Sequence, residues 1–304
     1  MTNLNDFFEK SSKFNSIRYT DSNHSYLIDG IRAISGTQLI HRYTPEFNQL
    51  EIAQKSADKL GVHVGFILNE WAKKNVKSTV KGTLMHEFIE LQYQKRELEF
   101  DDKKIKEMII LSLKRVETYN PEFSDFKSDI EEVFNLVKKS IEKTIPKIQK
   151  FLNESLGALI PIASEFIVGD SEFRICGTID QLFYNKTHNS LQIWDWKTNN
   201  KIDVKRFFKD DFYMKEPISN IENTNFWHYS IQLSLYKFIL QKITGIEVGE
   251  LWLCHFDDEQ NDYVLYNCPY LEHEIQLLLN HNLTIMLKDE ELDKLNQQLQ
   301  NTKE

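Results

Sequence analysis

Apolar and polar residues alternate most regularly in two neighbouring runs, which predict a pair of β-strands. The runs lie within residues 173–197, on either side of a polar Asn-Lys-Thr-His-Asn segment that is typical of a turn. An antiparallel hairpin is therefore expected. With the turn centred between Thr187 and His188, Asp180 is expected to lie directly opposite Asp195.

The pattern before this hairpin is mainly helical. Short β-prone runs over residues 17–34 predict a small hairpin or ribbon, followed by a helix that Ser35 or Thr37 caps. Apolar residues then recur at helical spacing over residues 45–76, with a break near Gly61. This pattern predicts two or three helices.

A further helix is expected to begin at Gly82, because Leu84, Phe88 and Leu91 then form one apolar arc. The charged segment 98–155 is expected to be a helical insertion or cap that carries no chemistry. Its predicted helices cover residues 103–117 and 121–152.

The pattern around and after the hairpin predicts more strands, one more buried helix and a closing helix. A strand region starts at Pro161, with Gly169-Asp170 as the turn between strands at 165–168 and 172–175. The later expectations are a polar loop at 199–226, a helix at 227–244, strands at 251–256 and 263–266, and a helix at about 270–298.

These elements predict a mixed α/β class with a central mixed sheet flanked by helices. Three parts are expected along the chain. Residues 1–81 form an N-terminal ribbon with helices, residues 82–269 form the core with its helical insertion, and residues 270–304 form a helix and tail.

Composition narrows the class of protein. The chain has 304 residues, of which 41% are hydrophobic, so it can bury a large core. Its formal net charge of −9 gives no overall indication of nucleic-acid binding. The cysteines Cys176, Cys254 and Cys268 lack the spacing of a zinc or iron–sulfur site. Without an apolar leader, membrane span or nucleotide-binding glycine motif, a soluble cytoplasmic protein is expected.

The hairpin carries the first candidate chemistry. Directly opposed residues have Cβ atoms about 4.5–5.5 Å apart, so Asp180 and Asp195 would repel each other without a cation between them. Lys197 is expected on the same face as Asp195, whereas Trp194 and Trp196 point to the other face. Two close carboxylates with a nearby ammonium suit Mg²⁺ or Mn²⁺ and a phosphate.

Two alternatives accompany this interpretation. Asp-x-Lys also occurs at Asp101, Asp102, Asp125 and Asp203, and the alternative for the hairpin copy is a surface ion pair on an edge hairpin. The apolar residues around Asp195 argue against that alternative, because they indicate a strand buried on both sides. His86 and Glu90 lie four residues apart on one helix, where His86 taken alone is an ordinary helix-edge histidine.

The segments GTLMHEFIE, GTID, WDWKT and QLSLY, in this order, resemble the PD-(D/E)xK nuclease superfamily and, more narrowly, its RecB-like branch with phage-type exonucleases. The resemblance covers about residues 82–240 and implies a restriction-endonuclease-like core. It implies that metal ligands are His86, Asp180, Asp195 and the main-chain carbonyl of Trp196, and that Lys197 is catalytic.

The same resemblance implies supporting or DNA-contacting roles for Glu165, Glu90, Thr198, Gln232 and Tyr236. Glu172 competes with Glu165 for the acidic position on the first strand. The cofactor would be Mg²⁺ or Mn²⁺, and no iron–sulfur cluster is expected because the four cysteines of some relatives are missing.

The resulting hypothesis is a metal-dependent DNA exonuclease of phage or bacterial replication, recombination or repair. A separate helicase or recombinase would supply unwinding, because helicase motifs are absent. The alternatives are a catalytically silent DNA-end or partner-binding module and a restriction-type endonuclease. The basic and aromatic run at residues 205–209 is either a DNA contact or a short amphipathic helix.

Overall fold

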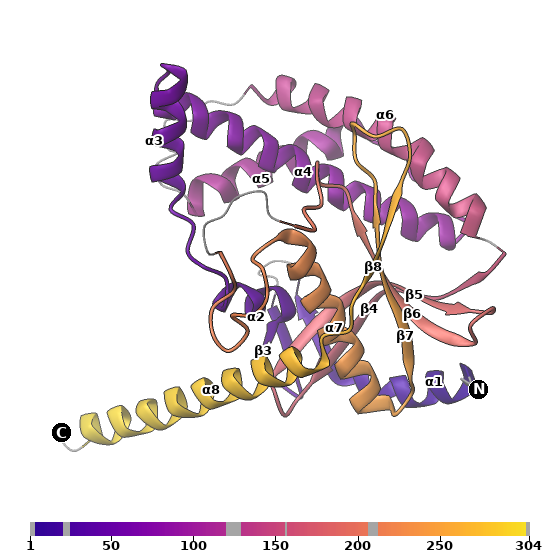
Figure 1. Cartoon of the computed structure of the whole chain (residues 1–304), viewed down its shortest axis with the longest axis vertical. Helices are drawn as coiled ribbons and strands as arrows, with labels where there is room; N and C mark the ends of the chain where they lie inside the picture. Colours follow the sequence, from indigo (N-terminus) through magenta and orange to yellow (C-terminus); the bar gives the residue numbers. More distant parts are fainter. Residues whose placement is uncertain (1–3, 21–24, 120–128, 156, 206–211, 302–304) are drawn as a thin grey trace.

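An eight-stranded mixed sheet forms the centre of the protein (Figure 1). Its architecture comes from a computed structural model that describes residues 4–20, 25–119, 129–155, 157–205 and 212–301. The strands are β1 (Ile17–Thr20), β2 (Ser25–Ile28), β3 (Ile31–Ser35), β4 (Leu159–Asp170), β5 (Ile175–Asn185), β6 (Ser190–Lys197), β7 (Val248–His255) and β8 (Val264–Cys268).

The strand order is β1-β2-β3-β5-β6-β7-β8, and β4 pairs with the remaining edge of β5. The pairs β3–β5 and β6–β7 are parallel, and the other pairs are antiparallel. β5 occupies a special place, because β3 pairs with its beginning and β6 with its end, along one and the same edge. The middle of β5, including Asp180, therefore has no ladder partner on this edge.

The helices are α1 (Leu4–Ser11), α2 (Gly36–Arg42), α3 (Gln49–Leu60), α4 (Val64–Tyr93), α5 (Asp102–Tyr119), α6 (Ile130–Ser155), α7 (Asn225–Thr244) and α8 (Glu272–Asn301), with a 3-10 turn at Ser12–Ser16. They cover both faces of the sheet (Figure 1). One core joins the sheet to α1, α2, α7 and the start of α8, and the other joins it to α4, α5 and α6.

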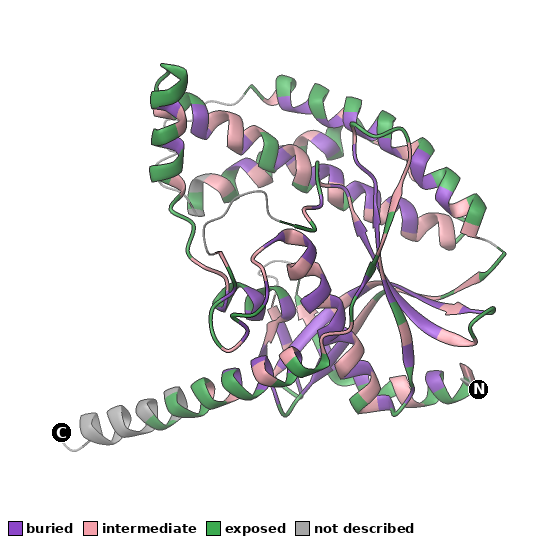
Figure 2. Cartoon of the chain, in the orientation of Figure 1, coloured by how far each residue is buried: buried purple, intermediate pink, exposed green. Residues whose placement is uncertain are grey.

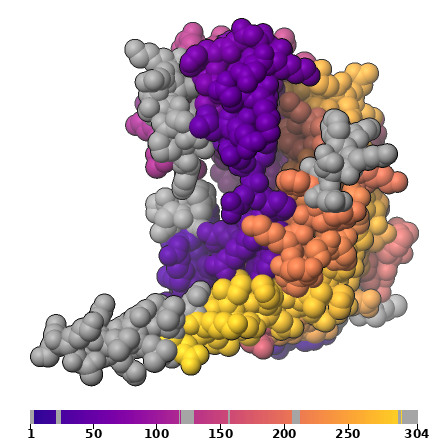
Figure 3. Space-filling model, turned by 60° about the vertical axis from the view of Figure 1, so that its left-hand side comes forward, coloured from indigo at the N-terminus to yellow at the C-terminus, as the bar shows by residue number. Residues whose placement is uncertain are grey.

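Burial follows these layers. The central strands are mostly buried, whereas the outer faces of α3 and α6 are exposed (Figure 2). Every residue of β6 between its first and last is buried, as expected for a strand covered on both sides. In Figure 3 the start of α8, in yellow, lies along the orange part of the chain, in agreement with its packing on α7.

The hairpin prediction is confirmed. β5 and β6 pair in the expected register, with Gln181 opposite Trp194 and Asn185 opposite Ser190. Trp194 and Trp196 pack into the core with α4–α6, while Lys197 faces α7, so alternation also places these side chains as predicted. The mixed fold class is confirmed as well.

The expected helix start at Gly82 is wrong. One helix, α4, runs from Val64 through Gly82 to Tyr93, because Val76, Val80 and Leu84 continue a single buried stripe across the glycine. The predicted boundary between residues 81 and 82 therefore falls inside a helix, and the division into three parts stays a prediction.

The expected turn at Gly169-Asp170 is also wrong by about two residues. β4 continues through Asp170, and the turn occupies residues 171–174, so the strand predicted at 172–175 does not form there. The Asp170 carboxylate accepts hydrogen bonds from the backbone N–H groups of Glu172 and Phe173, which fixes this turn.

Other predictions are confirmed in outline. Ser35 caps α2 through a capping box with Gln38, and Gly61 ends α3 in a left-handed conformation. Helix α7 and strands β7 and β8 form where expected. The predicted helix start at residue 121 and most of the basic and aromatic run at 205–209 lie outside the described residues.

None of the helices in the described part of the chain combines the length and the apolar character needed to cross a bilayer.

Candidate active site

Three carboxylates lie at the same level on three neighbouring strands. The ladder between β4 and β5 pairs the residues on both sides of Glu165 with those on both sides of Asp180. The ladder between β5 and β6 stops at the pair before Asp180 and Asp195. Glu165, Asp180 and Asp195 therefore form a row across β4, β5 and β6, at the point where regular pairing is interrupted.

The interruption has two local causes. Glu165 has a φ of 47°, which places a non-glycine residue in the left-handed region, and the Glu165–Asp180 pair is missing from the β4–β5 ladder although the register is the same on both sides. Asp180 Oδ2 accepts a hydrogen bond from the Trp196 N–H at 2.9 Å, so a side chain replaces the missing ladder bond to β6. A left-handed non-glycine residue is costly and is often found at functional sites.

Helix α4 brings His86 to the row of carboxylates. Its Nδ1 lies 3.6 Å from Glu165 Oε1 and 3.6 Å from Asp180 Oδ2. Its Nε2 lies 3.1 Å from the Trp196 carbonyl oxygen and donates to it in the matching tautomer. His86 thus joins α4 to all three strands of the site.

Lys197 and Asp195 form the other half of the site. Lys197 Nζ lies 2.5 Å from Asp195 Oδ2 and 4.5 Å from the ring centre of Tyr229 on α7. Asp195 is 3% exposed, and the Lys197 ammonium is the one close polar partner of its Oδ2 among the described residues. His86, Glu165, Asp180, Asp195 and Lys197 are named the active-site cluster below.

Charge in the active-site cluster is unevenly compensated. Burial lowers the pKa of His86, but the Asp180 and Glu165 carboxylates outweigh this effect and raise it to about 9. Burial raises the pKa of Asp195 to about 6, although the Lys197 ammonium opposes the shift. Burial also disfavours the Lys197 ammonium, yet Asp195 and Asp180 hold the pKa of Lys197 above its ordinary value. Lys197 is therefore a cation at neutral pH.

His86 and Glu165 of the cluster border a cleft of about 360 Å³. The residues that line this cleft are Gly82, Thr83, His86, Glu87, Glu90 and Glu165. Glu90 follows His86 by one helical turn and accepts a hydrogen bond from Gln94 at 2.9 Å. The cleft wall is rich in carboxylates, so a phosphate diester would be repelled unless a cation intervened.

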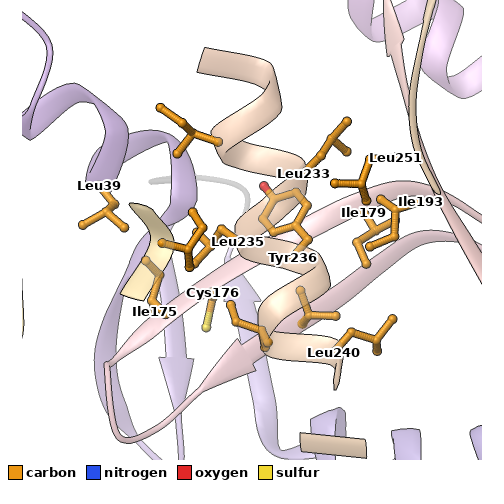
Figure 4. Packing of buried hydrophobic residues seen from close by; sticks show 14 of the residues in the cluster. Leu39, Ile175, Cys176, Ile179, Ile193, Leu233, Leu235, Tyr236, Leu240 and Leu251 are labelled. Carbon is orange, nitrogen blue, oxygen red and sulfur yellow. The ribbon is translucent and has the colours of Figure 1, made fainter. Parts of the chain in front are cut away.

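Gln232 and Tyr236 lie behind the cluster on α7. Gln232 Nε2 donates to Tyr236 Oη at 2.9 Å. Tyr236 is 3% exposed and is surrounded by buried apolar side chains of α7 and the sheet (Figure 4). A Cβ on Gly177 would lie 2.1 Å from Tyr236 Cε1, so this glycine leaves the space that the tyrosine ring fills. Tyr236 is therefore a buried packing residue between α7 and the sheet, and the supporting or DNA-contacting role of Gln232 and Tyr236 stays a prediction.

The structure separates the two acidic candidates of the first strand. Glu165 lies in the row beside His86, whereas Glu172 lies in the turn after β4 and pairs with Lys242 at 2.6 Å. Thr198 is buried at the end of β6, where its carbonyl accepts a hydrogen bond from Lys81 Nζ at 2.9 Å.

Sequence reasoning missed Tyr229 and Lys81. Tyr229 precedes Gln232 by three residues, so a helical wheel could have placed it near the site. Lys81 directly precedes Gly82, and the expected helix start at Gly82 hid the fact that it belongs to the same helix as His86.

The donor set fits a hard divalent cation. One ligand atom each from His86, Glu165 and Asp180 lie within 4.8 Å of one another, and the nearby buried Asp195 Oδ2, 2.5 Å from Lys197 Nζ, could add a third carboxylate oxygen. Carboxylate oxygens with one imidazole suit Mg²⁺ or Mn²⁺, and the nitrogen is more favourable for Mn²⁺.

Comparison with known proteins points in the same direction. Residues 60–303 match the family model of the PD-(D/E)XK nuclease superfamily. No curated protein matches the chain. A crystal structure of the protein SSO0001 is 14% identical and aligns over 57% of this chain and 69% of that one, with a TM-score of 0.25. A likeness of that strength carries no argument about this chain.

Proposed function

Because the chain belongs to the PD-(D/E)XK nuclease superfamily, we propose that it is a metal-dependent deoxyribonuclease that hydrolyses phosphodiester bonds. The observation that carries the proposal is the convergence of His86, Glu165 and Asp180 next to the Asp195–Lys197 pair. The order of motifs along the chain favours an exonuclease of the RecB-like branch. Such an enzyme would act on DNA ends in phage or bacterial replication, recombination or repair, in the cytoplasm and beside a separate helicase or recombinase.

The metal would be held by His86, Asp180 and Asp195, with Glu165 and the Trp196 carbonyl as further ligands. A bound Mg²⁺ or Mn²⁺ supplies charge stabilisation at the phosphate and activates the attacking water. The carboxylates around the cleft explain why a cation is needed, since DNA and this wall carry the same sign of charge.

Lys197 has a role that its protonation state defines. As an ammonium it has no free electron pair, so it does not take the proton from the attacking water. It donates hydrogen bonds instead, which orient the water and stabilise the extra negative charge on the phosphate as the bond to the water forms. The Tyr229 ring and Asp195 hold the ammonium beside the carboxylate row.

The test is incubation of the purified protein with end-labelled single-stranded and double-stranded DNA, with Mg²⁺, Mn²⁺ or EDTA. Cleavage is expected with either metal and is lost with EDTA. Lys197→Ala is expected to lower kcat by about 100- to 1,000-fold, as for the loss of one donor to a developing charge. Lys186→Ala, in the exposed turn of the same hairpin, is the matched control and retains full activity.

Closed circular DNA separates the alternatives. An exonuclease leaves a covalently closed circle intact and degrades it after linearisation, whereas a restriction-type endonuclease cuts the circle. If the wild-type protein binds DNA ends but leaves every substrate intact with both metals, the chain is a catalytically silent module and the proposed activity is refuted.

A further inference from the structure

The backbone that carries Lys197 is held at three successive carbonyl groups. The Lys197 carbonyl accepts a hydrogen bond from the Phe256 N–H at 2.8 Å, and the Thr198 carbonyl accepts one from Lys81 Nζ at 2.9 Å. The Asn199 carbonyl accepts from His255 Nε2 at 2.5 Å. The donor His255 is the last residue of β7, Phe256 directly follows this strand, and Lys81 belongs to α4.

Lys81 is unusual because it is a lysine with 1% exposure. Its charge is balanced by Asp258, whose Oδ1 lies 2.5 Å from Lys81 Nζ. Asp258 also accepts from Lys77 at 2.7 Å and from the Ser140 hydroxyl at 2.6 Å. Thr144 Oγ1 lies 3.4 Å from Asp258 Oδ1. Lys77, Lys81, Ser140, Thr144 and Asp258 are named the Asp258 cluster below.

Helix α4 thus touches the end of β6 at two points that flank Lys197. His86 Nε2 meets the Trp196 carbonyl, and Lys81 Nζ meets the Thr198 carbonyl. A buried ammonium without its counter-ion is strongly disfavoured, so Asp258 is what keeps Lys81 in this place. Through Asp258 the cluster also links the segment after β7 to α4 and α6. The same segment contains Phe256, whose N–H donates to the Lys197 carbonyl.

We propose that Lys81 and Asp258 are positioning residues for Lys197: the buried pair fixes the end of β6 so that the Lys197 ammonium is presented to the scissile phosphate. This inference rests on the proposed nuclease function. Neither residue reaches the cleft, so neither is expected to contact DNA. Their effect would pass through the Thr198 carbonyl and the backbone of residues 197–199.

The first measurement is the steady-state kinetics of Lys81→Met, which keeps the linear side chain and removes the charge. Because a displacement of about 1 Å can cost about 100-fold in rate, kcat is expected to fall by about 10- to 100-fold. KM for DNA is expected to stay within about twofold, since Lys81 does not bind substrate. Asp258→Asn, which keeps the shape of the side chain, is expected to shift kcat in the same direction and serves if Lys81→Met does not fold.

Lys242→Met is the matched control, because Lys242 also balances a buried aspartate, Asp170, at 2.6 Å. That pair lies at the far end of β4 and makes no contact with the end of β6 in the described residues. Lys242→Met is expected to lower the melting temperature while leaving kcat unchanged. A drop in kcat of equal size in both variants would mean that loss of stability alone explains the effect, and the positioning role would be refuted.

Hydrogen–deuterium exchange gives a measurement that does not depend on activity. Lys81→Met and Asp258→Asn are expected to speed exchange in peptides covering residues 194–200 and 252–258, while Lys242→Met speeds it near residue 170. If wild type is inactive on DNA, the nuclease proposal fails, and exchange alone then decides whether the pair holds the end of β6. Unchanged exchange at residues 194–200 in both cluster variants would overturn the inference.

Discussion

The active-site cluster and the Asp258 cluster both place aspartates in a protein interior, but they compensate the charge in opposite ways. In the active-site cluster, three carboxylates share one ammonium and one imidazolium, and burial raises the pKa of Asp195 to about 6. In the Asp258 cluster, burial also acts to raise the pKa of Asp258, but Lys77, Lys81 and Ser140 outweigh it and hold the pKa far below its ordinary value.

The difference in charge compensation indicates a different role for each cluster. Both carboxylate oxygens of Asp258 accept hydrogen bonds from protein donors, so the Asp258 cluster has no acceptor left for a ligand, is called closed below, and stabilises the fold. In the active-site cluster, Asp195 Oδ2 has the Lys197 ammonium at 2.5 Å as its partner, while His86 and Glu165 border a cleft. An excess of negative charge next to open space is what a site for a divalent cation requires.

The largest expected effect comes from Asp180→Asn. Changes to residues that only contact a metal ligand typically weaken metal binding by roughly 10- to 100-fold. Loss of a carboxylate from the row itself is expected to weaken Mn²⁺ binding by more than that. Calorimetric titration with Mn²⁺ measures this change. Asp258→Asn is the counterpart in the closed cluster and is expected to change the Mn²⁺ affinity by less than about tenfold. An equal loss of Mn²⁺ affinity in both variants would contradict the assignment of the cation site to the active-site cluster alone.

Stability is expected to show the reverse order. Asp258→Asn leaves Lys81 buried without its counter-ion and is expected to lower the free energy of unfolding by about 3 kcal/mol. Asp180→Asn removes repulsion within the row and still accepts the Trp196 N–H, so a change within about 1 kcal/mol is expected. Urea unfolding without metal compares the two variants, and a larger loss for Asp180→Asn would contradict this assignment.

Low pH is expected to reduce the stability that the ion pairs of Asp258 with Lys77 and Lys81 contribute. Since the folded-state pKa of Asp258 lies below its unfolded value, its contribution is complete above about pH 5 and is lost as the pH falls further. One such group adds a slope of up to about 1.4 kcal/mol per pH unit. Unfolding between pH 6 and pH 3 is expected to be less steeply pH-dependent in Asp258→Asn than in wild type. Parallel curves would show that Lys77 and Lys81 do not control this carboxylate.

The sequence predicted the half of the site that depends on local pattern. The register of β5 and β6 follows from a short turn and regular alternation, so these two features alone are enough to place Asp180, Asp195 and Lys197 on one face of the hairpin. The resemblance to a known family supplied His86 and Glu165. Their approach to within 3.6 Å depends on the docking of α4 over the sheet, which local pattern does not contain.

The Asp258 cluster could not be predicted, for a physical reason. Asp258 lies 177 residues from Lys81 and 118 from Ser140, and nothing in the local sequence of a polar loop after β7 marks one aspartate as buried. The helix start was misjudged because glycine lowers helix propensity by about 1 kcal/mol, while packing of α4 against α5 and α6 overrides that cost. The turn was misplaced because Gly169-Asp170 and Asp170-Ser171 are both turn-forming pairs.

The smallest expected effects are the losses of unfolding free energy when one hydroxyl group is removed from each region. The Ser140 hydroxyl donates to the charged Asp258 at 2.6 Å, so Ser140→Ala is expected to cost about 1.5–3 kcal/mol of unfolding free energy. The Tyr236 hydroxyl accepts from the neutral amide of Gln232, so Tyr236→Phe is expected to cost about 1 kcal/mol. The packing of the ring against Gly177 is kept in that variant.

Urea unfolding of these two variants at neutral pH measures the difference, and repetition at pH 3 sharpens it. The pKa of Asp258 lies far below its ordinary value, so its carboxylate is still ionised in the folded protein at pH 3, and the larger cost of Ser140→Ala is expected to persist there. A Tyr236→Phe cost that exceeds that of Ser140→Ala at both pH values would mean that hydrogen bonding to Asp258 is not what distinguishes the closed cluster. The burial of Tyr236 behind the active-site cluster would then be the stronger source of stability.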